Sequence, residues 1–284
     1  MWRDVDFLIS FLHIKYIIML VFVHLSTENT LPGHFQDLID LIVNWYPDIE
    51  YTLLTAPQEP LTAAHLHFMS LVQTHPRPAF WRYTLERFFV LDEWMRDHPQ
   101  CPVLHLENDV VPLCHPRDIQ DRLQTLIPDQ FAAPCDHEKR CIPSTVWIPC
   151  RSFLQGFLYF ALDHLQHQNP NATDMELLGL YSLAGLVTKL PVCPPDLDHA
   201  RDYSQKAYEL GLFDAAALGQ WVLGTHSHPG IPFENETAVY SAKGVTIDAH
   251  GKVIWPGCER TYCLNTLHVH SKKIQSLINR PSTL

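Results

Sequence analysis

The order of apolar segments near the start of the chain constrains the fold most. Residues 19–25 are apolar and rich in β-branched side chains, which predicts a buried strand. A Pro-Gly pair at 32–33 follows, and then apolar residues recur at helical spacing on one face: Phe35, Leu38, Ile39, Ile42 and Trp45. Pro47 ends this helix, and residues 50–55 predict the next strand. This order predicts two parallel strands joined by a covering helix.

The rest of the chain continues the alternation of strands and helices. A helix over residues 80–96 leads into the apolar run 101–111. The later segments predict a helix beginning near Arg117, a polar surface excursion at 134–140, a strand at 144–148, helices at 153–166, 174–186 and 203–223, and a hairpin at 244–255. We therefore expect an α/β fold with one mainly parallel sheet and helices on both faces. The sequence has no internal repeat and no strong domain boundary, so we expect a single domain over 1–284, with a core of about 17–275 and an N-terminal extension at 1–16.

Two carboxylates stand at the end of the apolar run 101–111. Side chains alternate faces along a strand, so Glu107 and Asp109 are expected on one side and Asn108 on the other. Paired carboxylates suit Mg²⁺ or Mn²⁺, and ligands of such sheets gather at the carboxyl ends of the strands. The pattern alone is common, because acidic-x-Asp triplets also occur at 4–6 and 196–198.

Composition limits the possible partners. The chain has 284 residues, of which 46% are hydrophobic, so it can bury a substantial core. Its net charge of −11 argues against nucleic-acid binding, which depends on clustered Lys and Arg. An anionic substrate would have to be bound by a few local cations. The eight cysteines lack CxxC spacing, and we expect them to be mostly reduced, buried thiols.

The apolar stretch 7–25 has two interpretations. Its length is near that of a membrane anchor, but Lys15 lies in its middle, where a charge is costly in a bilayer. A buried strand over residues 19–25 is the favoured interpretation, and it predicts a cytoplasmic protein. Membrane association through 7–25 is the alternative. The triplets 171–173 and 235–237 match the glycosylation pattern, which also arises by chance.

A second polar cluster lies near the end of the chain. On an extended segment His268 and His270 would face the same way, so either could offer an imidazole to a metal held by Asp109. Lys272 could neutralise a diphosphate oxygen. The same His-x-His format occurs at 65–67 and 226–228, and a strand histidine can simply bond to the backbone.

Taken in order, four segments resemble glycosyltransferases of the GT-A fold. They are the helix segment 84–91, the strand 103–110, the segment 212–220 and the segment 265–272. The resemblance covers about residues 19–274 and implies a single GT-A-like domain. It implies transfer of a sugar from a nucleotide-diphosphate donor to a glycan or other hydroxyl-bearing acceptor, with Mn²⁺ or Mg²⁺ as cofactor.

The resemblance also implies roles for the mid-chain residues. Asp109 would be the most direct metal ligand, and Glu107 a second ligand or a ribose contact. Glu stands where this family usually has Asp, and its longer side chain makes direct coordination less certain. Asn108 would contribute to the binding of the donor diphosphate. Arg87 would support the acidic residues or the donor, although a surface pair with Glu86 or Asp92 is the alternative.

The late residues receive roles in the same way. His268 or His270 would complete the metal shell, and Lys272 would bind the diphosphate and assist catalysis by stabilising the leaving group. The segment with Asp214 and Gln220 resembles the lining of the donor-sugar pocket, where Asp214 could bind sugar hydroxyls or act as a base. Asp214 could also simply cap the following helix.

Other interpretations remain open at the level of sequence. Asp174 and Glu176 stand near a predicted helix start, where acidic residues are favoured for structural reasons. The histidines and aspartates also fit a metallohydrolase with several imidazoles around one or two ions. A catalytically silent GT-A-like binding protein is the third possibility.

Overall fold

The computed structural model describes residues 19–26, 30–55, 59–195, 203–223, 244–248 and 251–278. Several predictions fall outside the described residues: the N-terminal extension, the first part of the apolar stretch 7–25, the acidic triplets at 4–6 and 196–198, and the histidines at 226 and 228. Within the described chain, none of the helices is long and apolar enough to cross a membrane.

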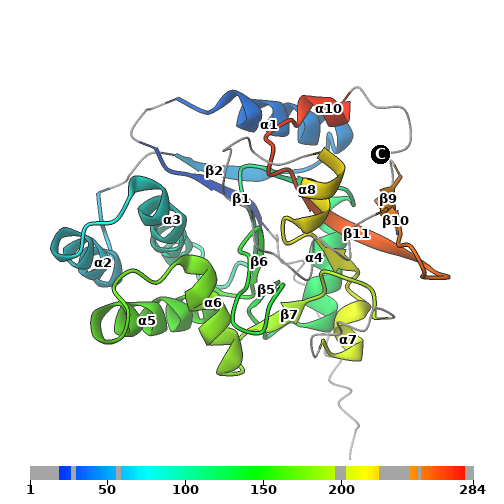
Figure 1. Cartoon of the computed structure of the whole chain (residues 1–284). Helices are drawn as coiled ribbons and strands as arrows, with labels where there is room; N and C mark the ends of the chain where they lie inside the picture. Colours follow the sequence, from blue (N-terminus) through cyan, green and yellow to red (C-terminus); the bar gives the residue numbers. More distant parts are fainter. Residues whose placement is uncertain are drawn as a thin grey trace, which may run out of the picture.

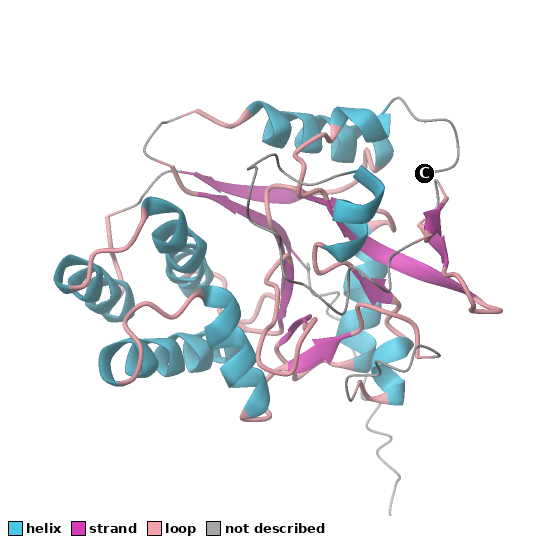
Figure 2. Cartoon of the chain, in the orientation of Figure 1, coloured by secondary structure: helices cyan, strands magenta, loops and turns pink. Residues whose placement is uncertain are grey.

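A six-stranded sheet forms the centre of the molecule (Figures 1 and 2). Its strand order is β2 (Tyr51–Thr55), β1 (Met19–His24), β3 (Val103–Leu106), β6 (Thr145–Ile148), β5 (Ala132–Pro134) and β7 (Thr188–Leu190). β1 is parallel to both β2 and β3, and β7 is parallel to β5, while β6 is antiparallel to its two neighbours. The predicted β1–α1–β2 unit, with α1 at Gly33–Trp45, is confirmed.

Alternate residues of β1 enter two different cores. Leu20 and Phe22 pack with α1 and with α4 (Pro116–Leu126), whereas Val21 and Val23 pack on the opposite face. The second face is covered by α2 (Ala63–Thr74), α3 (Ala79–Arg96), α5 (Arg151–His167) and α6 (Asp174–Leu183). Figure 1 shows these four helices together on one side of the sheet and α1 on the other. The predicted helical cover on both faces is therefore confirmed, although α2 was not predicted.

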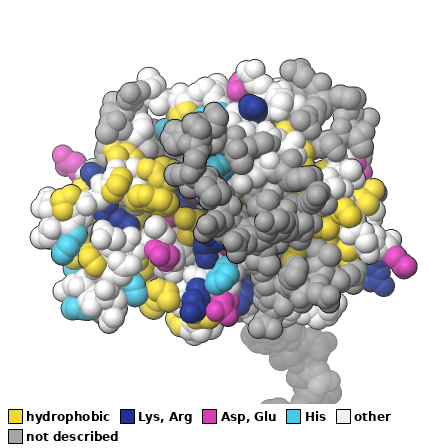
Figure 3. Space-filling model, in the orientation of Figure 1, with side chains coloured by type: hydrophobic (Ala, Val, Ile, Leu, Met, Phe, Trp, Pro, Cys, Tyr) yellow, Lys and Arg dark blue, Asp and Glu magenta, His cyan; other side chains and the backbone are white. Residues whose placement is uncertain are grey.

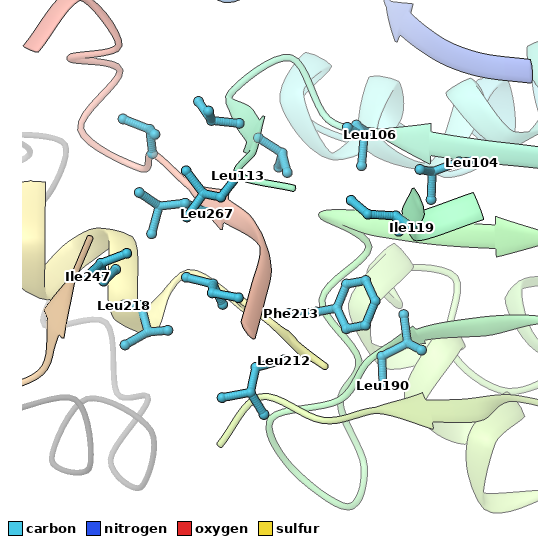
Figure 4. Packing of buried hydrophobic residues seen from close by; sticks show 14 of the residues in the cluster. Leu104, Leu106, Leu113, Ile119, Leu190, Leu212, Phe213, Leu218, Ile247 and Leu267 are labelled. Atoms are coloured by element: carbon cyan, nitrogen blue, oxygen red, sulfur yellow. The ribbon is translucent and has the colours of Figure 1, made fainter. Parts of the chain in front are cut away.

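A second sheet lies against the first core. Its order is β4 (Val110–Pro112), β11 (Thr261–His268), β10 (Lys252–Ile254) and β9 (Thr246–Ile247), and β8 (Leu212–Phe213) pairs with β11 in parallel. The predicted hairpin near 244–255 corresponds to β9 and β10. Figure 4 shows Leu267 of β11 and Phe213 of β8 in the same hydrophobic packing as Leu104 and Leu106 of β3. Strand β11, close to the end of the chain, is thus packed against the centre of the fold.

The prediction of one helix over residues 203–223 is wrong. The segment forms the short helix α7 (Gln205–Tyr208), strand β8 and helix α8 (Ala217–Leu223). Gly211 and Ala216 have positive φ angles of 87° and 72°, which end the helical path on each side of β8. Pairing with β11 outweighs the helical periodicity of this segment. A last short helix, α10 (Gln275–Ile278), packs near α1.

The cysteine prediction needs a correction. Cys135 and Cys141 form a disulfide, and both are buried. Of the other six, only Cys193 is buried and the rest are half-buried. The predicted surface excursion at 134–140 is only partly right, because residues 134–136 are buried and residues 137–139 are exposed. Structural disulfides are typical of oxidising compartments, whereas the sequence favoured a cytoplasmic protein.

The visible surface is mixed in charge. On the face shown in Figure 3, Lys and Arg side chains of the described residues are scattered among acidic, histidine and hydrophobic ones.

Candidate functional site

The two mid-chain carboxylates lie in a turn between the sheets. β3 ends at Leu106 and β4 begins at Val110. The backbone N–H of Val110 donates to the carbonyl of Glu107 at 3.1 Å and closes the turn between them. Glu107, Asn108 and Asp109 therefore do not belong to a strand, and the expected strand alternation is wrong as a reason for their placement. The turn still directs Glu107 and Asp109 to one histidine, because the chain reverses there from one sheet into the other.

His268 brings the end of the chain to these carboxylates. It is the last residue of β11 and pairs with Val110 in the ladder with β4. Its Nε2 lies 3.2 Å from Oδ2 of Asp109 and 3.7 Å from Oε2 of Glu107. One ligand atom from each of the three residues lies within 4.8 Å of the others. Among the described residues, this is the group of His, Cys, Asp and Glu side chains that could hold a cation.

His270 is not a member of that group. β11 ends at His268, so the two histidines do not share a strand face as expected. Their ring centroids are 6.0 Å apart, and the His270 N–H donates to the carbonyl of His268 at 2.9 Å. The structure thus favours His268 over His270 as the imidazole of the site.

Lys272 adds a cation to the same cluster. Its ammonium donates to Oδ2 of Asp109, and its side chain is 31% exposed. Its backbone has a φ of 61°, which is unusual for a residue other than glycine, and its N–H donates to the carbonyl of Val269 at 2.8 Å. Positive φ angles outside glycine often accompany functional sites, because the surrounding structure must hold them in place.

Arg87 joins two acidic side chains from different elements. This buried residue of α3 donates to Oε1 of Glu107 and, at 2.7 Å, to Oδ2 of Asp174, the first residue of α6. The alternative pairs are not formed, since Glu86 pairs with Arg82 and Asp92 with Arg151. Asp174 thus supports the cluster, although its sequence position indicated only a helix start.

Asp214 holds the backbone around His268. Its Oδ1 accepts a hydrogen bond from the Leu218 N–H, and its Oδ2 accepts from the N–H groups of Gly219 and His268. The capping interpretation is confirmed, because Leu218 and Gly219 belong to the first turn of α8. A role of Asp214 in catalysis stays a prediction. Gln220 lies on the same helix and is buried, with no hydrogen-bond partner for its Nε2 among the described residues.

Asn108 points to a different group. Its Nδ2 lies 3.0 Å from Nδ1 of His24, the last residue of β1. His34 of α1 is close enough for its pKa to respond to Lys272 and Asp109. Burial lowers the pKa of both histidines, so both are neutral at physiological pH. Sequence reasoning missed His24, although the end of the strand predicted at 19–25 places it at the same edge of the sheet as Glu107.

The charges of the cluster reinforce one another. Burial opposes ionisation of Asp109, but His268 and Lys272 outweigh it and hold the pKa of Asp109 well below its usual range. Burial likewise opposes ionisation of Glu107, and Arg87 with His268 lowers its pKa. Burial of His268 lowers its pKa, but the charges of Asp109 and Glu107 outweigh this effect and raise the pKa of His268 to about 9. In the absence of metal, the cluster therefore holds two carboxylates, an imidazolium, an ammonium and a guanidinium.

The donor set is compatible with a divalent cation. Two carboxylates and one imidazole fit Mn²⁺, and the hard oxygens also fit Mg²⁺. A metallohydrolase with several imidazoles is not supported, because His268 is the one histidine of the group within the described chain.

Comparison of the sequence with protein-family models and with curated proteins finds no match. Among solved structures, the chain is similar to a glycosyltransferase involved in the glycosylation of the major capsid of PBCV-1, with 13% identity and a TM-score of 0.37 over 59% of this chain and 76% of the other. It is also similar to mouse xyloside xylosyltransferase 1, with 8% identity and a TM-score of 0.37 over 64% of this chain and 90% of the other. At this distance neither likeness assigns an activity to the chain.

Proposed function

We propose that this protein is a metal-dependent glycosyltransferase that moves a sugar from a nucleotide-diphosphate donor to a hydroxyl group of a glycan or similar acceptor. The proposal depends on one observation: Glu107, Asp109 and His268 converge at the carboxyl end of β3, with the ammonium of Lys272 on Asp109. In α/β sheets this edge is where ligands gather.

The residues fit a divalent cation. Asp109 and Glu107 would supply oxygens and His268 its Nε2, once the imidazole has lost its proton. The second ring nitrogen, Nδ1, is buried without a hydrogen-bond partner among the described residues, so the imidazole is oriented through Nε2, by its hydrogen bond to Asp109 and its ion pair with Glu107. Bound Mn²⁺ or Mg²⁺ would neutralise negative charge on a departing nucleoside diphosphate.

Lys272 and Arg87 have different tasks in this proposal. Lys272 is partly exposed and now pairs with Asp109, so a cation on that carboxylate would release its ammonium for a diphosphate oxygen. Arg87 is buried and paired on both sides, so it orients Glu107 rather than the substrate. Leaving-group stabilisation by Lys272 is the catalytic contribution that we assign to this chain.

The remaining polar groups are assigned to the donor. Asn108 and its neighbour His24 lie beside the carboxylates at the end of β1 and would contact the nucleotide part. The side-chain amide of Gln220 is buried, its Nε2 has no partner among the described residues, and it would donate a hydrogen bond to a sugar hydroxyl. Asp214 would act mainly by holding the His268 backbone, and its use as a base on the acceptor is the less favoured role because both its oxygens already accept backbone hydrogen bonds.

A binding and turnover experiment tests the proposal. Calorimetry should show Mn²⁺ binding, and a nucleoside diphosphate should raise Tm only when Mn²⁺ is present, since a ligand of the native state increases apparent stability. Slow hydrolysis of a nucleotide sugar should accompany it. Asp109→Asn should abolish metal binding and turnover, whereas Asp163→Asn, on an exposed part of α5, should leave both unchanged. Metal and nucleotide binding that persists in Asp109→Asn would overturn the proposal.

A further inference from the structure

Two cysteines from distant parts of the chain meet beside the second sheet. Cys114 follows β4, and Cys263 lies within β11, 149 residues later. Their sulfur atoms are 2.9 Å apart, in hydrogen-bond contact. A disulfide bond is about 2.05 Å long, so closure requires an approach of less than about 1 Å. The ladder between β4 and β11 already holds the two backbones side by side.

The surroundings give the two thiols different properties. The hydrogen bond from Cys114 and the positive charge of Arg122 lower the pKa of Cys263 to about 6, against burial and the charge of Asp118. The hydrogen bond with Cys263 and burial raise the pKa of Cys114. Tyr46 also interacts with both cysteines. Cys263 is therefore the nucleophile of the pair, and Cys114 holds the proton.

We propose that Cys114 and Cys263 form a second disulfide by exchange with a small-molecule disulfide. Both side chains are half-buried, so a small reagent can reach them. The Cys263 thiolate attacks one sulfur of the reagent and releases one thiolate. The Cys114 sulfur then loses its proton to solvent and attacks Sγ of Cys263 in the mixed disulfide, which releases the second thiolate. The two protein thiols lose two electrons, the reagent gains them, and its two thiolates take up the two protons.

This bond would act on the architecture in a different way from the existing disulfide. Cys135 and Cys141 are six residues apart and close a local loop. A bond between Cys114 and Cys263 would join the strand that follows Asp109 to the strand that ends at His268. A cross-link over such a long loop restricts the unfolded chain strongly and should stabilise the folded state.

Peptide mapping of the full chain tests the inference. After incubation with oxidised glutathione, proteolysis without reduction should yield one peptide pair that joins Cys114 to Cys263, next to the pair that joins Cys135 to Cys141. Tm should rise by several degrees over that of protein in which only Cys135–Cys141 is oxidised. Both effects should be lost in Cys114→Ser and in Cys263→Ser, and kept in Cys150→Ser, a half-buried cysteine next to Ser152.

Two results would overturn the inference. One is separate glutathione adducts on Cys114 and Cys263 without a cross-link between them. The other is cross-linking of either residue to a different cysteine. Neither outcome depends on metal or nucleotide binding, so failure here leaves the proposed function untouched.

Discussion

The carboxylate of Asp214 accepts a hydrogen bond from the backbone N–H of His268 at 3.0 Å, although the two residues are 54 positions apart. The same oxygen accepts from Gly219 at 2.7 Å, so Asp214 joins α8 to the end of β11. The position of the His268 imidazole next to Asp109 depends on this link.

Asp214→Asn should weaken metal binding without touching a proposed ligand. An asparagine has one oxygen acceptor, so its NH₂ group would face backbone N–H donors that Asp214 now satisfies. We expect a loss of about 1–3 kcal/mol in the free energy of unfolding. Mn²⁺ affinity should fall about 10- to 100-fold, as is usual when a group that orients a ligand is lost. Titration calorimetry measures the affinity. Unchanged affinity with a large loss of turnover would instead favour Asp214 as the catalytic base.

Arg87→Met should be strongly destabilising, because it removes the guanidinium that pairs with the half-buried carboxylate of Glu107 and with the buried carboxylate of Asp174. We expect a loss of about 3–5 kcal/mol in the free energy of unfolding. Arg117→Met removes an exposed pair with Asp48, which solvent screens, and should change the free energy of unfolding much less. Urea unfolding of both variants checks this, and similar losses for the two would contradict it.

The Arg87→Met deficit should also shrink as pH falls. Arg87 lowers the folded pKa of Glu107, so its contribution is present above the unfolded value and is lost as pH falls through the folded value. Arg87→Met lacks this stabilisation of the ionised Glu107, so wild type loses more stability than the variant as pH falls. Unfolding curves at neutral pH and near pH 4 provide the comparison.

Gly219→Ala should displace His268. A Cβ at Gly219 would lie 1.8 Å from the backbone oxygen of His268, so α8 and β11 would have to separate. We expect a loss of about 1–3 kcal/mol or more, together with weaker metal binding. Gly33→Ala is the matched control, since a Cβ there meets nothing within 4 Å and should be neutral or slightly stabilising. Equal Tm values for Gly219→Ala and wild type would refute the close contact.

The metal-free protein should lose stability on the alkaline side of neutrality. The folded pKa of His268 is about 9, above the ordinary value of about 6.5 for a histidine in the unfolded chain, so the protonated form is favoured by folding. This contribution is complete below about pH 6.5 and disappears as pH rises through about 9, with a decrease of at most about 3 kcal/mol. Urea unfolding with a chelator present should show this slope in wild type and a flatter one in His268→Gln. His65, whose pKa is also raised, is present in both proteins and cancels in the difference.

The sequence predicted the elements better than their connections. The apolar periodicity placed α1, α3 and α5 within two residues of their observed bounds. One clear buried face explains this for α1 and α5, whereas α3 is buried on all sides between Leu85 and Glu93. The segment 203–223 misled the same reasoning, since its periodic apolar residues pair with β11, and a sequence pattern does not show which distant strand will compete with a helix.

The site was predictable to a similar degree. Glu107, Asp109, His268 and Lys272 do meet, but through a turn and a strand end rather than along one strand face. The contact of Asp174 with Arg87 joins residues 87 positions apart and could not be read from the sequence. His24 could have been noted at the end of its predicted strand, but its contact with Asn108, 84 residues later, could not. The pairing of Cys135 with Cys141 also came only from the structure.

His268 stands 159 residues after Asp109, on a strand that is central to the second sheet. During synthesis the carboxylates therefore leave the ribosome long before the imidazole that completes their cluster. Until β11 docks, Asp109 has neither of its cationic neighbours, and any proteolytic cut that releases the segment after residue 260 would remove both at once. Cation binding would thus report whether the last part of the fold has been assembled.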